Sequence, residues 1–141
     1  MQIGVDSDRA VDNRRVFVVD NDEITCAALQ FMLHDEIETH EIASLAAAYA
    51  KAVDWKPDLM LLGIGIVKDF GIGILAEIHA KISDLKIILV ADTASDPLAQ
   101  ACLKNGVNSI LAKPLTIEKA RQRVDAQLGR SVKLSIPVVQ V

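Results

Sequence analysis

The sequence predicts one α/β domain in which short apolar strands alternate with helices. Its length of 141 residues suits a single domain with one hydrophobic core. Hydrophobic residues make up 51% of the chain but aromatic residues only 4%, so the core must consist mainly of Ile, Leu, Val and Ala. This composition is typical of helices packed on a parallel sheet. We therefore expect a five-stranded parallel sheet with helices on both faces, connected by right-handed crossovers.

Five short runs that are mostly apolar and end at polar or turn-forming residues predict the strands. They lie at 15–20, 38–42, 59–62, 86–90 and 109–111. Continuous apolar runs of this kind are typical of strands that are buried on both faces of a sheet.

Helical spacing follows each strand, and residues that cap helix N-termini mark where the helices begin. The candidate N-caps are Asp22, Ser44, Ser95 or Asp96, and Thr116. Pro97 in a first turn and Gly106 just after the end agree with the usual positions of proline and glycine in helices. The glycines at 63, 65, 71 and 73 predict a permissive loop before the third helix, because their spacing fits neither phosphate-binding glycine motif.

The domain organisation follows from these patterns. Residues 1–13 are mostly polar and predict a flexible leader, 14–129 form the domain, and 130–141 form an apolar tail. No run is long enough for a membrane span, so we expect a cytoplasmic protein without a membrane partner. The net charge of -4 argues against nucleic acid as a partner.

Cysteine and histidine spacing predicts no metal site. Cys26 and Cys102 lie in helical segments, and neither has a metal-type spacing to a histidine. We expect both to be buried free thiols.

In an open parallel sheet, the loops after the strands gather at one edge, where ligands bind. This rule selects the residues that could bind a ligand or take part in a reaction. They are Asp20 to Glu23, 63–69, 91–94, and Lys113 with Pro114.

From about residue 14 to 128 the chain resembles the receiver domain of bacterial two-component response regulators, which has a flavodoxin-like fold. The resemblance depends on three motifs in the expected order and spacing. They are Val18-Val-Asp-Asn-Asp-Glu23, Pro57-Asp-Leu-Met-Leu-Leu62 and Gly106-Val-Asn-Ser-Ile-Leu-Ala-Lys-Pro114.

The resemblance implies a phosphoryl switch. Receivers take a phosphoryl group from a histidine kinase onto a carboxylate after the third strand, beside a magnesium ion held by acidic residues after the first. A hydroxyl after the fourth strand and a lysine after the fifth hold the phosphoryl oxygens, and an aromatic residue in the fifth strand reports the state.

Several of these positions carry a different residue here. The acceptor position is Gly63, the hydroxyl position is Ala91, and the aromatic position is Ile110. The second acidic position is Asn21, which leaves Asp20 and Asp22 for a cation. We therefore expect a vestigial phosphorylation pocket, no catalytic residue, no cofactor, and magnesium binding that is at most weak, at Asp20.

Only Asp20 and the Lys113–Pro114 pair match the family pattern fully. The resemblance implies a cis peptide bond at Pro114. Lys113 either binds a phosphoryl group or pairs with Asp20 as a structural remnant. Thr93, two residues after Ala91, is a second candidate for the hydroxyl.

The leading functional hypothesis is a stand-alone receiver-like module that is not an enzyme and acts through phosphorylation-independent protein contacts in a signalling pathway. One alternative is a phosphoacceptor that uses a displaced carboxylate, Asp69 or Asp92. Another is a small-molecule binder at the vacated acceptor pocket.

Self-association is also expected. The resemblance points to the face made by the helix beginning at Pro97, the strand at 109–111 and the last helix, and the apolar tail is a second candidate for a homodimer contact.

Overall fold

The computed structural model describes residues 14–130 as five parallel strands and six helices. The strands are β1 (Arg15–Val19), β2 (Glu38–Ile42), β3 (Leu59–Gly63), β4 (Lys86–Ala91) and β5 (Ser109–Ala112). The helices are α2 (Glu23–Leu33), α3 (Leu45–Ala52), α4 (Ile64–Phe70), α5 (Ile74–Lys81), α6 (Pro97–Leu103) and α7 (Ile117–Leu128). The predicted leader and, except for Arg130, the predicted tail lie outside the described residues.

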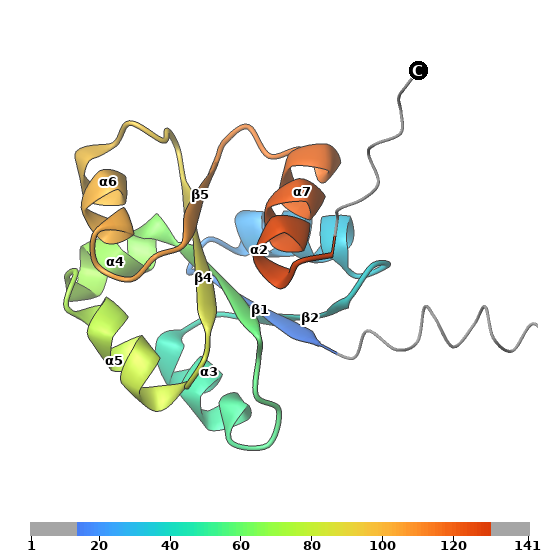
Figure 1. Ribbon diagram of the computed structural model, residues 1–141, viewed down its shortest axis with the longest axis horizontal. Coiled ribbons are helices and arrows are strands. Elements are labelled where there is room, and N and C mark those ends of the chain that lie inside the picture. Colours follow the sequence, from blue (N-terminus) through green and yellow to red (C-terminus); the bar gives the residue numbers. More distant parts are fainter. Residues whose placement is uncertain (1–13, 131–141) are drawn as a thin grey trace, which may run out of the picture.

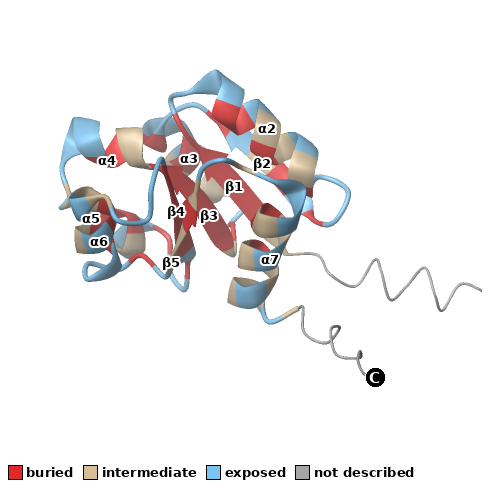
Figure 2. Ribbon diagram, turned by 90° about the horizontal axis from the view of Figure 1, so that it is seen from above, coloured by how far each residue is buried: buried red, intermediate tan, exposed pale blue. Residues whose placement is uncertain are grey.

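The predicted fold class is confirmed: the strand order is β2-β1-β3-β4-β5 and every pairing is parallel. The central strand β3 is buried at all five positions (Figure 2). Its pairing places Gly63 beside Val90 of β4 and Leu62 beside Val19 of β1. The ends of the first, third and fourth strands therefore lie close together at the carboxyl edge.

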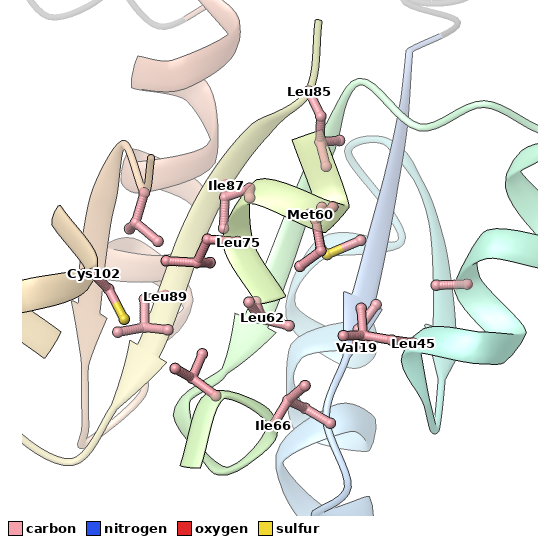
Figure 3. Close-up of a cluster of buried hydrophobic side chains, with 14 of the residues drawn as sticks. Val19, Leu45, Met60, Leu62, Ile66, Leu75, Leu85, Ile87, Leu89 and Cys102 are labelled. Carbon is pink, nitrogen blue, oxygen red and sulfur yellow. The ribbon is translucent and has the colours of Figure 1, made fainter. Parts of the chain in front are cut away.

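Two hydrophobic layers cover the sheet. Helices α2 and α7 pack on one face, while α3, α4, α5 and α6 pack on the other (Figure 1). Figure 3 shows the larger layer, in which Leu62 and Leu89 from the sheet meet Leu75 of α5 and Ile66 of α4. Aliphatic side chains supply nearly all of this core, as the composition predicted.

Side-chain caps set the helix boundaries as predicted. Asp22, Ser44 and Thr116 each accept a hydrogen bond from a backbone N–H in the first turn of α2, α3 and α7. Asp96, not Ser95, caps α6. The last helix ends at Gly129, whose φ of 70° lies in the left-handed region that glycine tolerates.

The glycine-rich loop predicted after β3 is wrong, because residues 64–70 form the helix α4. This is also why there are six helices in the described residues and not five. Gly65 lowers helix stability by about 1 kcal/mol relative to alanine. Ile66 and Val67 are only 2% and 1% exposed, however, and their burial outweighs that cost. The chain leaves the helix at Gly71, with φ at 89°.

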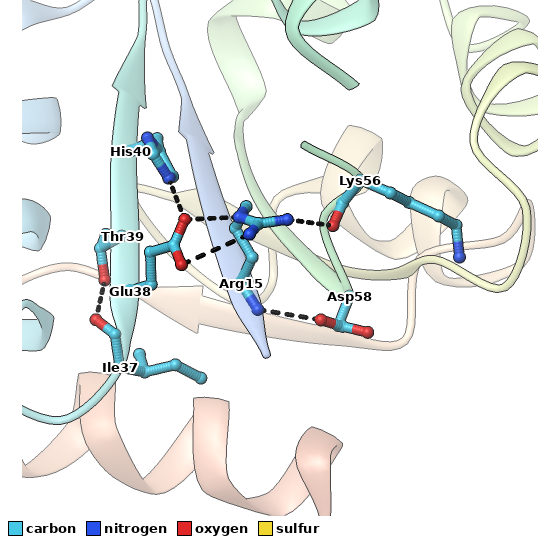
Figure 4. Close-up of polar contacts among 7 residues, drawn as sticks. All are labelled: Arg15, Ile37, Glu38, Thr39, His40, Lys56 and Asp58. Carbon is cyan, nitrogen blue, oxygen red and sulfur yellow. Dashed lines mark hydrogen bonds and ion pairs between the residues drawn. The ribbon is translucent and has the colours of Figure 1, made fainter. Parts of the chain in front are cut away.

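Polar contacts tie the opposite, amino-terminal edge of the sheet (Figure 4). Arg15 pairs with Glu38 at 2.5 Å, and the backbone N–H of Arg15 donates to Asp58. Glu38 also lies 2.6 Å from His40 Nε2. Side-chain hydrogen bonds with Arg15 and His40 favour the ionised carboxylate, which lowers the pKa of Glu38.

In the part of the chain that the structure describes, no helix is both long and apolar enough to cross a bilayer.

Candidate functional site

The carboxyl edge of the sheet carries a cavity of about 180 Å³ that gathers most of the predicted site residues. Its lining comes from the loops after β1, β4 and β5, from the start of α4 and from the end of β4. It consists of Asp20, Asn21, Asp22, Ile64, Gly65, Val90, Asp92 and Lys113. Asp20, Asn21, Asp22 and Lys113, which the strand-end rule selected from the sequence, line this cavity, whereas Gly63 and Ala91 do not.

Asp20 occupies the space that a side chain at position 63 would need. A Cβ added to Gly63 would overlap the Asp20 carboxyl group, with all three of its atoms closer than real contacts allow. Gly63 has an ordinary extended backbone, with φ at -69° and ψ at 138°. The obstacle at this position is therefore the Asp20 side chain and not the backbone.

Burial dominates the electrostatics of Asp20. The residue is 8% exposed, and this desolvation raises the pKa of its carboxyl group. A hydrogen bond from the Asp22 backbone N–H to Oδ1, 2.9 Å long, and the nearby Lys113 oppose the rise without cancelling it.

The neighbouring polar side chains already have protein partners. Asp22 caps α2 and also accepts from the Thr25 hydroxyl at 2.9 Å, which lowers its pKa. The Asn21 side-chain amide donates to Asp69 Oδ2 of α4 at 3.0 Å. The loop after β1 is thus hydrogen-bonded both to α2 and to α4.

These residues do not fit a magnesium ion. Mg²⁺ loses its water reluctantly and usually needs anionic oxygen ligands arranged octahedrally. Asp22 is committed to the helix cap, Asn21 donates to Asp69, and Gly63 has no side chain. Of the other two carboxylates that line the cavity, Asp92 pairs with Lys113, which leaves Asp20. No group of three or more acidic, histidine or cysteine residues in the described part of the chain is placed to hold a metal.

Lys113 pairs with a residue other than the one expected. Its ammonium lies 3.7 Å from Asp92 Oδ1, so the predicted pair with Asp20 is wrong. The reason is that Asp20 turns down over Gly63, whereas Asp92 extends from the loop after β4 and is 78% exposed. The following Lys113–Pro114 peptide bond is cis.

The two positions that the resemblance assigns to the switch carry apolar residues. Ala91 is 1% exposed and belongs to the core, and Ile110 packs against that same core. Thr93 is exposed, and its hydroxyl lies 3.4 Å from that of Ser95. Thr93 is also not among the residues that line the cavity.

Sequence reasoning missed a second, open cavity of about 280 Å³ on the other side of Asp20. Besides Asp20 and Asn21 it is lined by Glu23, Cys26, Glu41, Ile42 and Ala43. Because β2 lies beside β1, the loop after β2 had to reach this edge, and the parallel-sheet rule contains that signal. Burial raises the pKa of the Cys26 thiol to about 11, which disfavours the thiolate at neutral pH.

The comparisons with known proteins agree with the fold. The model of the response regulator receiver domain family matches residues 16–125. The chain therefore belongs to the response regulator receiver domain family, whose members act in two-component signal transduction.

Among curated proteins, the chain is 28% identical over 126 residues to the transcriptional regulatory protein PrrA of Mycobacterium tuberculosis. The match covers 87% of this chain and 53% of PrrA. It is 29% identical over 69 residues to the transcriptional regulatory protein KdpE of Staphylococcus aureus, covering 49% and 29% of the two chains. The chain thus spans about half the length of PrrA, and its match spans less than a third of KdpE.

Solved structures show the same fold. A two-component response regulator from Clostridium difficile superposes with a TM-score of 0.73 at 24% identity, covering 84% of this chain and 98% of that one. The N-terminal signal receiver domain of a response regulator from Bacteroides fragilis gives a TM-score of 0.76 at 20% identity, covering 85% and 100%.

Proposed function

We propose that this receiver domain acts through protein contacts in its signalling pathway and is not switched by an aspartyl phosphate. The single observation that carries the proposal is the Asp20 carboxylate lying over Gly63, in the space of the missing acceptor. A phosphoryl group on a residue at position 63 would need both a new side chain and the displacement of Asp20.

The surroundings support the same function. A phosphoryl switch needs a metal to neutralise charge and a hydroxyl that moves toward the phosphoryl oxygens. Asn21 and Asp22 are engaged within the protein, and Ala91 has no hydroxyl. A ligand shifts a conformational equilibrium only by its different affinity for the two states. Without these contacts, a phosphoryl group would have nearly the same affinity for both states and would shift the equilibrium little.

A displaced acceptor is the second candidate, and one contact favours Asp92 over Asp69. Asp92 lines the cavity beside Lys113, 3.7 Å away, so a phosphoryl group there would already have a cation. Asp69 accepts a hydrogen bond from Asn21 and does not line the cavity. A small molecule in the place of the missing side chain has less support, because Asp20 fills that space.

Incubation with acetyl phosphate and magnesium, followed by intact mass measurement, tests the proposal. We expect no added phosphoryl group on the natural sequence or on Asp92→Asn. A stoichiometric addition that Asp92→Asn abolishes would establish the displaced acceptor in place of our proposal. Binding to a protein partner from the same pathway should be equal before and after the treatment.

A further inference from the structure

Helix α2 carries apolar side chains on two opposite faces, and the described residues cover only one of them. The inner face packs against the sheet and α7 through Thr25, Cys26, Leu29 and Leu33. The outer face carries four apolar residues with the i, i+3, i+4, i+7 spacing of one helix face. We define these four as the α2 stripe: Ile24, Ala27, Ala28 and Phe31.

The α2 stripe faces solvent in the described part of the chain. Ile24 is 81% exposed and Phe31 68% exposed, while Ala27 is exposed and Ala28 half-buried. A helix that is apolar on both faces is normally covered on both. Contiguous exposed apolar side chains of this kind mark a surface that contacts another molecule.

Acidic residues adjoin the N-terminal end of the stripe. Glu23 lies one turn before Ala27, and together with Glu41 of β2 it lines the second cavity, of about 280 Å³. Both glutamates are exposed, and neither forms an ion pair with another described residue. Ile42 and Ala43 give the same cavity an apolar wall, against which the methylene stem of a long basic side chain can pack.

The C-terminal end of the stripe adds no free positive charge. Arg121 and Arg130 both pair with Glu36, each at 3.4 Å, so these opposite charges compensate one another. Asp35 has the His34 ring 3.4 Å away, and that ring is charged only when it is protonated. The uncompensated charge around the stripe is therefore negative.

This charge distinguishes between the possible occupants. If α2 packed against α2 of a second copy, Glu23 would approach Asp35 in an antiparallel pair and the other Glu23 in a parallel pair. Both arrangements bring like charges together. An anionic membrane surface is repelled for the same reason. A protein helix with an apolar face and basic flanks complements both the stripe and its charge.

We propose that the α2 stripe and the acidic cavity beside it bind a basic amphipathic helix of a partner protein. The apolar face of that helix covers Ile24 and Phe31, and a lysine or arginine side chain enters the cavity between Glu23 and Glu41. The inference rests on the proposed function, because it assigns the surface and the partner chemistry for the protein contacts which that function requires.

Two synthetic peptides of about 18 residues, long enough to form a helix in water, test the chemistry of the occupant. Both carry leucine on one face, and the other face carries lysine in one peptide and glutamate in its matched counterpart. Fluorescence anisotropy with the full chain should show saturable binding of the lysine peptide and at least about tenfold weaker binding of the glutamate peptide. Equal affinities for the two peptides would overturn the proposal.

Substitutions of exposed apolar residues test the stripe. Ile24→Gln/Phe31→Gln should weaken binding of the lysine peptide about tenfold. The matched control is Val53→Gln/Phe70→Gln, which removes two side chains that are 82% and 64% exposed on the opposite face of the sheet. The control should bind as the natural sequence does, and equal losses in the two variants would overturn the proposal.

Substitutions of exposed carboxylates test the cavity. Glu23→Gln/Glu41→Gln should also weaken binding about tenfold and reduce its dependence on salt. The control, Asp54→Asn/Asp84→Asn, removes the same charge from exposed positions that precede β3 and β4, at the opposite edge of the sheet. Equal losses here would show a general attraction between the acidic protein and the basic peptide, and would overturn the proposal.

Two further outcomes separate the alternatives. A dimer that Ile24→Gln/Phe31→Gln converts to a monomer in sedimentation would assign the stripe to a second copy and overturn the proposal. Peptide binding that the stripe variant weakens, and that acetyl phosphate leaves unchanged, supports both this inference and the proposed function. Binding that the stripe variant weakens but that changes with phosphoryl uptake supports the surface and contradicts the proposed function alone.

Discussion

The Asp20 carboxylate lies over the Cα atom of Gly63, in the volume that any side chain at position 63 must enter. In a receiver with an acceptor carboxylate, these two positions would both contribute anionic groups to one site. Here a single buried carboxylate takes the shared space, so the identity of one residue determines what the other can be.

This relationship predicts a non-additive pair of substitutions. Gly63→Ala should destabilise the protein by about 1–3 kcal/mol, because the added methyl group overpacks the site against Asp20. In the Asp20→Ala background the same change should be neutral or stabilising by up to about 1 kcal/mol, since the backbone at Gly63 is ordinary and alanine restricts the unfolded chain. Urea unfolding of the four proteins measures the coupling. Equal costs in both backgrounds would show that Asp20 is not the obstacle.

Restoring the acceptor alone should not restore the switch. Gly63→Asp introduces a second carboxylate against Asp20, so it should accept phosphate slowly at most and leave partner binding unchanged. Adding Asn21→Asp and Ala91→Thr supplies a metal ligand and a hydroxyl, and the triple variant should be modified more completely. Intact mass measurement after incubation with acetyl phosphate, with and without magnesium, gives the fraction of each protein that carries a phosphoryl group. A single variant that matches the triple variant would contradict this account.

Magnesium should bind to the natural sequence with millimolar affinity or weaker. The reason is that one carboxylate offsets little of the cost of removing water from the ion. Titration calorimetry measures the affinity, and Asp20→Ala is the control that removes the buried carboxylate. Micromolar binding that Asp20→Ala abolishes would show that the loop rearranges into a metal site.

The two edges of the sheet should respond to pH in opposite directions. Burial raises the pKa of Asp20 above its ordinary value of 3.8. The ionised form of Asp20 therefore lowers the free energy of unfolding at neutral pH. This loss is recovered as the pH falls through the raised pKa toward 3.8. Asp20→Asn should therefore stabilise the protein near neutral pH, with a gain that shrinks on acidification.

Glu38 provides the opposite case and the control. Its pKa is lowered by Arg15 and His40, so it contributes stability above 4.5 that is lost as the pH falls through the lowered value. Glu38→Gln should destabilise the protein at neutral pH and less so in acid. Urea unfolding between pH 3 and 7 compares the two variants, and slopes of the same sign would refute the assignment. The Glu38 effect should be small, because the pair is partly exposed.

Self-association is predicted through the face of α6, β5 and α7. Leu103 and Ile117, 38% and 41% exposed, give this side apolar contact points. If the chain forms a dimer there, Leu103→Gln/Ile117→Gln should shift sedimentation toward the monomer. Unchanged sedimentation would remove this face as the dimer contact.

The sequence by itself determined the order of the five strands, the order of five of the six described helices, three of the helix caps, and the edge of the sheet where the strand-end loops gather. These features depend on neighbours in the chain: alternating apolar runs, Asp22, Ser44 and Thr116 before helices, and the rule that parallel strands end at one edge. The resemblance implied that Gly63, Ala91 and Ile110 depart from the family pattern, which stays a prediction.

Only the tertiary structure decided which side chains meet. The loop predicted after β3 became α4 because Ile66 and Val67 are buried against the sheet, a gain that local glycine content does not reveal. Lys113 pairs with Asp92 because Asp20 turns into the space above Gly63. The direction of the Asp20 side chain depends on the space that stays empty above Gly63 after the strands have packed. No pattern along the sequence predicts that space.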